Sequence, residues 1–251
     1  MSDLAIEATN LSKRYGSVTA VDGLDLAVEH GEIYGFLGPN GAGKSTTIAM
    51  LLDYARPSDG QLRVLGRDPQ SEVVPIHQRL GVLPDRYGLY GDLTARRHIQ
   101  FVGDVKDTET DSETLLARVG LENAATQQVD GFSQGMAQRL ALAMALVGDP
   151  ELLVLDEPFT GLDPHGVRRV REIVHEENDR GATVFFSSHV LGQVDLVCDR
   201  IGILADGRLV AEGSIEELRE TTDADPSATV EDIFLTATDG SVSVTPTEGD
   251  R

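Results

Sequence analysis

The amino-terminal third of the chain alternates short apolar runs with turns. Strand-like runs cover residues 5–11 and 18–28, and the fully apolar run Ile33–Leu37 leads directly into a glycine-rich loop. Residues 46–54 after this loop have a helical pattern, and a further strand-like run at 60–66 follows a Pro-Ser-Asp-Gly turn. This order predicts strands first, then a loop and a helix that are joined to a buried strand.

The middle of the chain changes to a helical pattern over residues 92–147. Its apolar residues recur at three- and four-residue spacing, at Leu115, Leu116, Val119, Met136, Leu140, Ala143, Met144 and Val147. From residue 152 onward strands and helices alternate again. We expect strands at 152–155, 183–187 and 201–204, helices at 164–179, 190–197 and 215–220, and a hairpin through Asp206-Gly207. Continuous apolar strands alternating with helices predict an α/β fold with a parallel sheet covered on both faces, interrupted by a helical insertion.

Composition limits the possible classes of protein. The chain has 251 residues, 40% of them hydrophobic, which suits one large domain or a domain with a subdomain. No apolar run approaches the roughly 20 residues that a membrane-crossing helix needs. The start of the chain has no pattern of a secretory signal, so we expect a cytoplasmic protein. The single cysteine, Cys198, excludes an internal disulfide and a thiolate metal cluster.

The charge is strongly negative. The chain has 42 acidic and 21 basic residues, a net charge of −21, and its only lysines are Lys13, Lys44 and Lys106. Such a surface repels polyanions, so we expect no nucleic acid as a partner. Abundant carboxylates with few lysines are typical of proteins from salt-accumulating halophiles, where molar salt screens self-repulsion. A halophilic origin is therefore a hypothesis, and full stability at low salt would contradict it.

The glycine-rich loop carries the strongest chemical signal. Its sequence "GPNGAGKST" matches Gly-x4-Gly-Lys-[Ser/Thr] between a buried strand and a helix, the setting in which backbone N–H groups surround nucleotide phosphates. Lysine in this motif reaches the β- and γ-phosphates, and the serine after it ligates Mg²⁺. We therefore predict a nucleotide site made of Gly38, Pro39, Asn40, Gly41, Ala42, Gly43, Lys44, Ser45 and Thr46.

Two further strand ends carry polar residues that suit phosphate chemistry. "LLVLDEP" ends an apolar strand in Asp156 and Glu157, at the carboxyl edge of the expected parallel sheet. Asp156 is the natural carboxylate on the Mg²⁺ side, and Glu157 is placed to orient or deprotonate the attacking water. His189 ends another strand, so we expect it at the same edge, within reach of the γ-phosphate or the water.

These segments together resemble one family. "FSQGMAQR" (132–139) is similar to the Leu-Ser-Gly-Gly-Gln signature, "GLDP" (161–164) to the D-loop, and His189 to the switch histidine of ATP-binding-cassette transporters. The resemblance covers roughly residues 4–219. It implies a P-loop NTPase (RecA-like) core with an amino-terminal antiparallel β subdomain and an inserted α-helical subdomain. The expected domain is 1–220 with its helical insertion at about 86–148, and residues 221–251 form an acidic, largely flexible tail.

The resemblance also implies how ATP is held. In the family two cassettes pack head to tail, so Ser133 and Gly135 would act on the ATP of the other chain, and Tyr15 would stack on adenine. Ser133 is also suited to cap the helix that follows it. The signature departs from the family pattern at Gln134 and Met136. The position of the family's glutamine loop is Asp85, an acceptor that is tolerable beside a polyphosphate only where Mg²⁺ or water intervenes.

The implied function is that of an ATPase subunit which dimerises on ATP, as a homodimer or paired cassette, and drives separate transmembrane permease subunits. We expect it on the inner face of the cell membrane, and its motifs are most similar to those of exporter-type members. The alternative is a soluble ATPase of the same class that acts in macromolecular assembly. Within the tail, residues 230–235 are predicted either to dock on the body or a partner or to form a fraying terminal helix.

Overall fold

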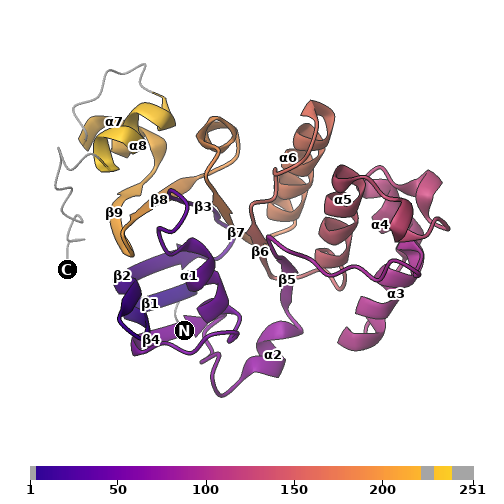
Figure 1. Cartoon of the computed structure of the whole chain (residues 1–251), viewed down its shortest axis with the longest axis horizontal. Helices are drawn as coiled ribbons and strands as arrows, with labels where there is room; N and C mark the ends of the chain where they lie inside the picture. The colour runs from indigo at the N-terminus through magenta and orange to yellow at the C-terminus, as the bar shows by residue number, and fades with distance from the viewer. Residues whose placement is uncertain (1–3, 222–228, 239–251) are drawn as a thin grey trace.

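Two sheets carry the fold of the computed structural model, which describes residues 4–221 and 229–238 (Figure 1). The smaller sheet is antiparallel and has the order β2-β1-β4, made of β1 (Leu4–Tyr15), β2 (Val18–Glu29) and β4 (Asp59–Val64). It forms the amino-terminal β subdomain that the family resemblance implies. Among the described residues no helix is both long and apolar enough to cross a bilayer.

The larger sheet places the chemistry-bearing segments side by side. Its order is β5-β6-β7-β3-β8-β9, and all neighbours run parallel except the β8–β9 hairpin, which turns at Asp206-Gly207 as predicted. Its strands are β3 (Ile33–Leu37), β5 (Leu80–Leu83), β6 (Leu152–Asp156), β7 (Thr183–Ser188), β8 (Arg200–Ala205) and β9 (Arg208–Gly213). The carboxyl ends of β5, β6, β7 and β3 therefore meet along one edge.

Alternating side chains on the central strands divide the core into two layers. Tyr34, Phe36 and Phe185 face the layer formed with α1 (Lys44–Leu51) and the smaller sheet. Val184 and Phe186 face the opposite layer, formed with the helices of the insertion and α6 (Pro164–Asp179). Successive side chains of a strand point to opposite faces, so these fully apolar strands contribute to both layers. The predicted sheet with two covered faces is confirmed.

Three helices lie together at one end of the molecule, beyond β5 and β6 (Figure 1). They are α3 (Ala95–Lys106), α4 (Ser112–Arg118) and α5 (Gln134–Ala145). In sequence they fall between β5 and β6, where the helical pattern predicts them. Shorter helical segments are α2 (Val73–His77) and the 3₁₀ turns Glu122–Ala124 and Val129–Gly131. Helix α6 has the bounds 164–179 expected from the sequence.

The helix predicted at 190–197 is wrong. The structure has only a 3₁₀ helix there, Leu191–Leu196, with Val197 N–H bonded to the carbonyl of Val194 at 3.0 Å. Glycine and β-branched valines lower α-helix propensity in this segment, and the short turn is held because Val194 and Val197 are buried.

After α7 (Ile215–Thr221) the chain returns as α8 (Val230–Thr238). Its residues Val230, Ile233 and Ala237 are buried, and α8 packs against α7, the 3₁₀ helix Leu191–Leu196, β8 and β9. The apolar residues predicted at 230–235 are therefore part of a docked helix. Residues 222–228 and 239–251 of the predicted flexible tail lie outside the described residues.

Candidate active site

The predicted site residues that follow four strands lie at one edge of the larger sheet. The glycine-rich loop follows β3, Asp156 ends β6, His189 follows β7, and Asp85 follows β5. Asp85, Glu157 and His189 line one pocket of about 490 Å³ together with residues of the loop, and the buried Asp156 lies next to Glu157 behind that lining. Its lining is Ala20, Pro39, Asn40, Gly41, Gly43, Lys44, Ser45, Thr46, Asp85, Glu157, Thr160 and His189. The strand order explains the gathering, because β5, β6, β7 and β3 are adjacent and parallel.

The glycines of the loop are required by close approaches of the backbone. A Cβ on Gly38 would lie 2.5 Å from the carbonyl oxygen of Leu204, and one on Gly43 would lie 2.5 Å from that of Ala20. Gly43 also has a φ of +113°, which side-chain-bearing residues rarely adopt, and helix α1 begins immediately after it. The loop is thus held against β8 and β2 while its N–H groups and the helix N-terminus lie beside the pocket.

Lys44 is buried at the floor of the pocket. Its Nζ donates to the carbonyl oxygen of Gly38 at 2.6 Å and of Pro39 at 3.3 Å, and it lies 3.8 Å from Oε1 of Glu157. Burial lowers the pKa of this ammonium, and the charges of Glu157 and Asp156 oppose that shift. The loop thus supplies a cation that is bonded to carbonyl oxygens and available to a phosphate in the same pocket.

Asp156 is a buried carboxylate held by hydroxyl groups. Ser187 donates to its Oδ1, and the Ser45 hydroxyl is hydrogen-bonded to it as well. Burial raises the pKa of Asp156, the Ser187 bond opposes this rise, and the negative charge of Asp85 adds to it. A cation bound beside Asp156 would offset both the burial and the repulsion between the carboxylates.

Glu157 and His189 are in direct contact. Nδ1 of His189 lies 2.8 Å from Oε1 of Glu157, and the backbone N–H of His189 donates to Oε2 at 3.4 Å. The backbone of Glu157 is in the left-handed region, with φ of 53°, and its N–H donates to the Ser187 carbonyl and hydroxyl at 3.3 and 3.1 Å. These bonds support an uncommon conformation that directs the carboxylate into the pocket.

The two predicted signature residues lie elsewhere on the same chain. Ser133 and Gly135 line a separate pocket of about 300 Å³ with Asp163, the N-cap of α6. The predicted cap is confirmed, because Oγ of Ser133 accepts from the N–H of Met136 at 3.3 Å at the start of α5. Ser133 and Gly135 are thus in a different pocket from the glycine-rich loop of the same chain.

Tyr15 is not among the residues that line the pocket. Its side chain is 51% exposed at the end of β1, and Nζ of Lys13 lies 4.8 Å from the centre of its ring. An exposed ring with a cation on it remains available for stacking at the surface.

Two contributors were missed in the sequence. Gln138, buried on α5, donates to the carbonyl oxygens of Glu157 at 3.5 Å and Pro158 at 3.3 Å. It therefore connects the helix that follows the signature to the backbone of the Glu157 segment. Thr160 lines the pocket from the same segment. A glutamine on a mostly apolar helix was a signal for Gln138 in the sequence, whereas Thr160 had none.

Comparison with known proteins agrees with this geometry. The family model described as ABC transporter matches residues 21–160. The chain is 40% identical over 220 residues to the bacitracin transport ATP-binding protein of Bacillus licheniformis, covering 86% of this chain and 71% of the relative. It is 37% identical over 230 residues to a daunorubicin resistance ATP-binding protein of Streptomyces coeruleorubidus, covering 90% and 73%.

Solved structures show the same fold. An ATP-binding subunit of an ABC transporter superposes with a TM-score of 0.86 at 27% identity, covering 93% of this chain and 99% of the other. A dimeric ATP-binding cassette bound to ADP and Pi superposes with a TM-score of 0.77 over 84% of this chain and 98% of the other, and at 22% identity it shows the fold alone. The family match, the curated relatives and the pocket agree: this chain belongs to the ABC transporter family, as an ATP-binding ATPase subunit.

Proposed function

We propose that two copies of this chain, or this chain and a paired cassette, close on ATP and power export through separate transmembrane subunits at the inner face of the membrane. The single observation that carries the proposal is the division of the site into two half-sites on one chain. The proposal takes residues 1–220 as the ATP-binding domain, with its helical insertion at about 86–148 and the tail at 221–251.

Within the composite site each predicted residue has a role. The loop 38–46 holds the phosphates through its N–H groups and Lys44, and Tyr15 stacks on the base. Ser133 and Gly135 of the partner subunit bring the N-terminus of α5 to the γ-phosphate. Glu157 accepts a proton from the attacking water or orients it, and His189, bonded to Glu157, contacts the same water or the γ-phosphate.

The donor set suits Mg²⁺. Ser45 and Asp156 offer a hydroxyl and a carboxylate oxygen, already joined by a hydrogen bond. Magnesium in nucleotide sites is bound through one or two such oxygens plus substrate phosphates, which fits a chain whose described residues contain no cluster of three or more metal-binding side chains. When bound, the ion neutralises charge on the β- and γ-phosphate oxygens. We assign Ser45 and Asp156 as its ligands, with Asp85 acting directly or through water.

The role of Asp85 gives a prediction. Asp85 lines the pocket and its charge reaches Asp156, so Asp85→Asn removes one acidic group from the site. If Asp85 helps to hold the ion, we expect the Mg²⁺ concentration that gives half-maximal ATPase activity to rise about threefold to tenfold. Asp104→Asn makes the same change at an exposed position of α3 and serves as the control. An unchanged or lower Mg²⁺ requirement in Asp85→Asn would remove Asp85 from the metal site.

Export is supported by what the relatives are called. They are named for bacitracin transport, linearmycin resistance, daunorubicin resistance and Nod factor export. These names cover different compounds, so we propose that this chain supplies the mechanical work and that its permease partners select the cargo.

The proposal is tested by capturing the partner. The Glu157→Gln chain, tagged and purified from native membranes at high salt with Mg-ATP, should retain a polytopic membrane protein in stoichiometric amount, identified by mass spectrometry. Omitting ATP or adding Lys44→Ala should weaken that retention. A soluble scaffold or ribosomal protein in place of the membrane protein would preserve the ATPase chemistry and reject the export role.

A further inference from the structure

The carboxyl end of α4 is held by arginines from two other helices. This end has an αL glycine, Gly120, with N–H bonds from Gly120 to Ala117 and from Leu121 to Leu116 at 3.0 and 2.8 Å. That cap leaves the carbonyl groups of residues 118–120 without partners inside the helix. We call residues 118–120 the α4 turn.

Two guanidinium groups bind the carbonyls of the α4 turn. Arg139 of α5 donates from Nη1 to the carbonyl oxygens of Val119 at 3.0 Å and Gly120 at 2.9 Å, and Arg169 of α6 donates to that of Arg118. Cations at a helix carboxyl end satisfy its carbonyls and its dipole together. The turn is thereby joined on one side to α5 and on the other to α6.

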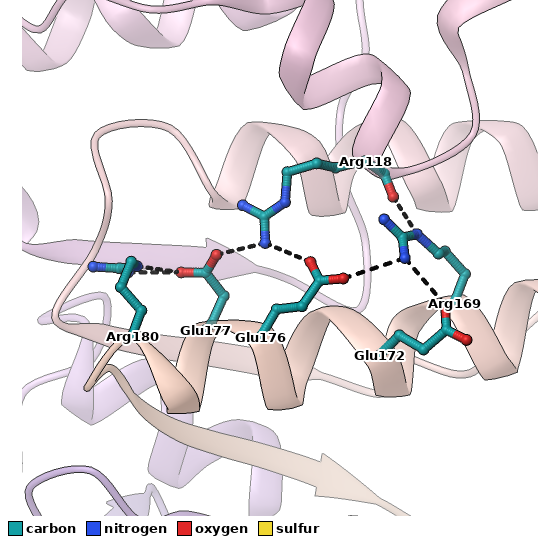
Figure 2. Close-up of polar contacts among 6 residues, drawn as sticks. All are labelled: Arg118, Arg169, Glu172, Glu176, Glu177 and Arg180. Carbon is teal, nitrogen blue, oxygen red and sulfur yellow. Dashed lines mark hydrogen bonds and ion pairs between the residues drawn. The ribbon is translucent and has the colours of Figure 1, made fainter.

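The side chain of Arg118 strengthens the connection to α6 (Figure 2). Its Nη2 lies 2.7 Å from Oε1 of Glu177 and 3.0 Å from Oε2 of Glu176, both on α6. The Glu177 side chain is 2% exposed and also pairs with Arg180 at 2.6 Å. Burial alone would lower the pKa of Arg118, but the bonds to Glu177 and Glu176 outweigh it and raise that pKa.

The contribution of the Arg118–Glu177 ion pair to stability depends on the burial of Glu177. Exposed ion pairs contribute little, as expected for Arg168 and Glu172, whose side chains are 74% and 40% exposed. Removing Arg118 instead leaves the buried carboxylate of Glu177 to be compensated by Arg180, so part of its pairing is lost inside the protein, which is costly. Arg118 joins α4 to two glutamates of α6, whereas Arg168 pairs with Glu172 within α6 and is exposed. Arg168 therefore serves as the control for loss of an exposed arginine–glutamate pair.

The same arginine of α5 contacts the signature. Nε of Arg139 donates to the carbonyl oxygen of Gly135 at 3.3 Å, two residues after Ser133. Helix α6 begins at its N-cap Asp163, which lines the pocket that contains Ser133, Gly135 and Arg139. The α5 segment that carries Ser133 and Gly135 is therefore connected to α6 through the α4 turn, which Arg139 of α5 and Arg169 of α6 both contact.

We propose that the α4 turn fixes the orientation of Ser133 and Gly135 relative to α6, and that Arg118 is a positioning residue for the half-site donated to the partner subunit's ATP. This inference rests on the proposed composite site. Loss of Arg118 should therefore disturb the signature of its own chain. The glycine-rich loop of that chain should be unaffected.

The first measurement separates ATP binding from closure. In a Glu157→Gln chain, Arg118→Met should leave the affinity of the dilute, monomeric chain for ATP within about twofold. It should raise the dissociation constant of the ATP-bound dimer, measured by analytical ultracentrifugation, about fivefold to thirtyfold. Arg168→Met should change neither quantity, and Arg118→Lys should restore part of the dimer affinity because one carboxylate contact remains possible.

The second measurement asks which chain carries the effect. The reference is a mixture of Ser133→Arg and Lys44→Ala chains, in which the competent loop belongs to the first chain and the intact signature to the second. Arg118→Met added to the Ser133→Arg chain should leave the activity of this mixture unchanged. Arg118→Met added to the Lys44→Ala chain should lower it at least about fivefold.

The outcomes are distinct. Equal losses in the two mixtures, or weaker ATP binding by the monomeric chain, would mean a general structural role and would overturn the inference. An inactive reference mixture would reject the composite site itself, and the inference with it. If Arg118→Met does not fold, Arg169→Met removes the bond to the α4 turn while keeping the Arg118–Glu177 pair, and the same two mixtures decide.

Discussion

Replacing Glu157 by glutamine is expected to lower the ATPase rate about 10²- to 10⁴-fold, the range attributed to a general base, while ATP binding is retained. The substitution keeps the size of the side chain and removes its charge and its ability to accept a proton. Lys44 and the loop, which hold the phosphates, are unchanged. ATP-bound dimers should accumulate in consequence, because opening follows hydrolysis in the proposed cycle.

The geometry supports this assignment over Asp156. The Asp156 carboxylate is buried and already bound by the hydroxyls of Ser187 and Ser45. Glu157 lies in the pocket lining, with Oε1 2.8 Å from Nδ1 of His189 and 3.8 Å from Nζ of Lys44. A base must reach a water in the pocket, and of the two carboxylates Glu157 has that access.

The measurement compares steady-state phosphate release with ATP affinity, and the ATP-bound dimer is followed by size-exclusion chromatography with light scattering. Glu151→Gln is the matched control, because it makes the same change just before the other end of β6, in a side chain that is 52% exposed and paired with Arg79. The control should keep full activity. Turnover close to wild type in Glu157→Gln would reject Glu157 as the base.

Much of the fold follows from the sequence because the decisive signals are local. Five-residue apolar strands and the glycine-rich loop reveal the parallel core, and α6 begins where an Asp-Pro pair supplies an N-cap and a first helical residue. The segment after His189 was mispredicted because its apolar residues have helical spacing, although glycine and valine favour only a 3₁₀ turn. The docking of α8 depends on a complementary surface that local pattern does not contain.

The candidate site also has a part that the sequence predicts and a part that it does not. Asp156, Glu157 and His189 could be assigned to one edge from their positions after strands, since parallel strands align their carboxyl ends. The contact between Glu157 and His189 and the left-handed backbone of Glu157 depend on the register of β6 against β7. The bonds of Gln138 to Glu157 and of Arg118 to Glu177 join segments that are 19 and 59 residues apart. Pairings of this kind have no periodic signature in sequence.

Ser133→Arg and Lys44→Ala chains are each expected to have almost no ATPase activity alone and to recover activity when mixed. Lys44→Ala removes the buried cation of the loop and so disables the phosphate site of its own chain. Ser133→Arg replaces the N-cap of α5 by a bulky cation and so disables the half-site that its chain donates. The two defects lie in different pockets of the chain.

A mixed dimer contains one intact composite site, from the loop of the Ser133→Arg chain and the signature of the Lys44→Ala chain. If equal amounts mix randomly and the sites act independently, the mixture should regain up to about a quarter of the wild-type rate. The control combines Ser133→Arg with a chain that carries both substitutions, which offers no intact signature and should remain inactive. Both chains must first show cooperative unfolding, and Ser133→Arg must bind ATP. With those conditions met, an inactive mixture would mean that the signature does not act on the partner subunit's ATP.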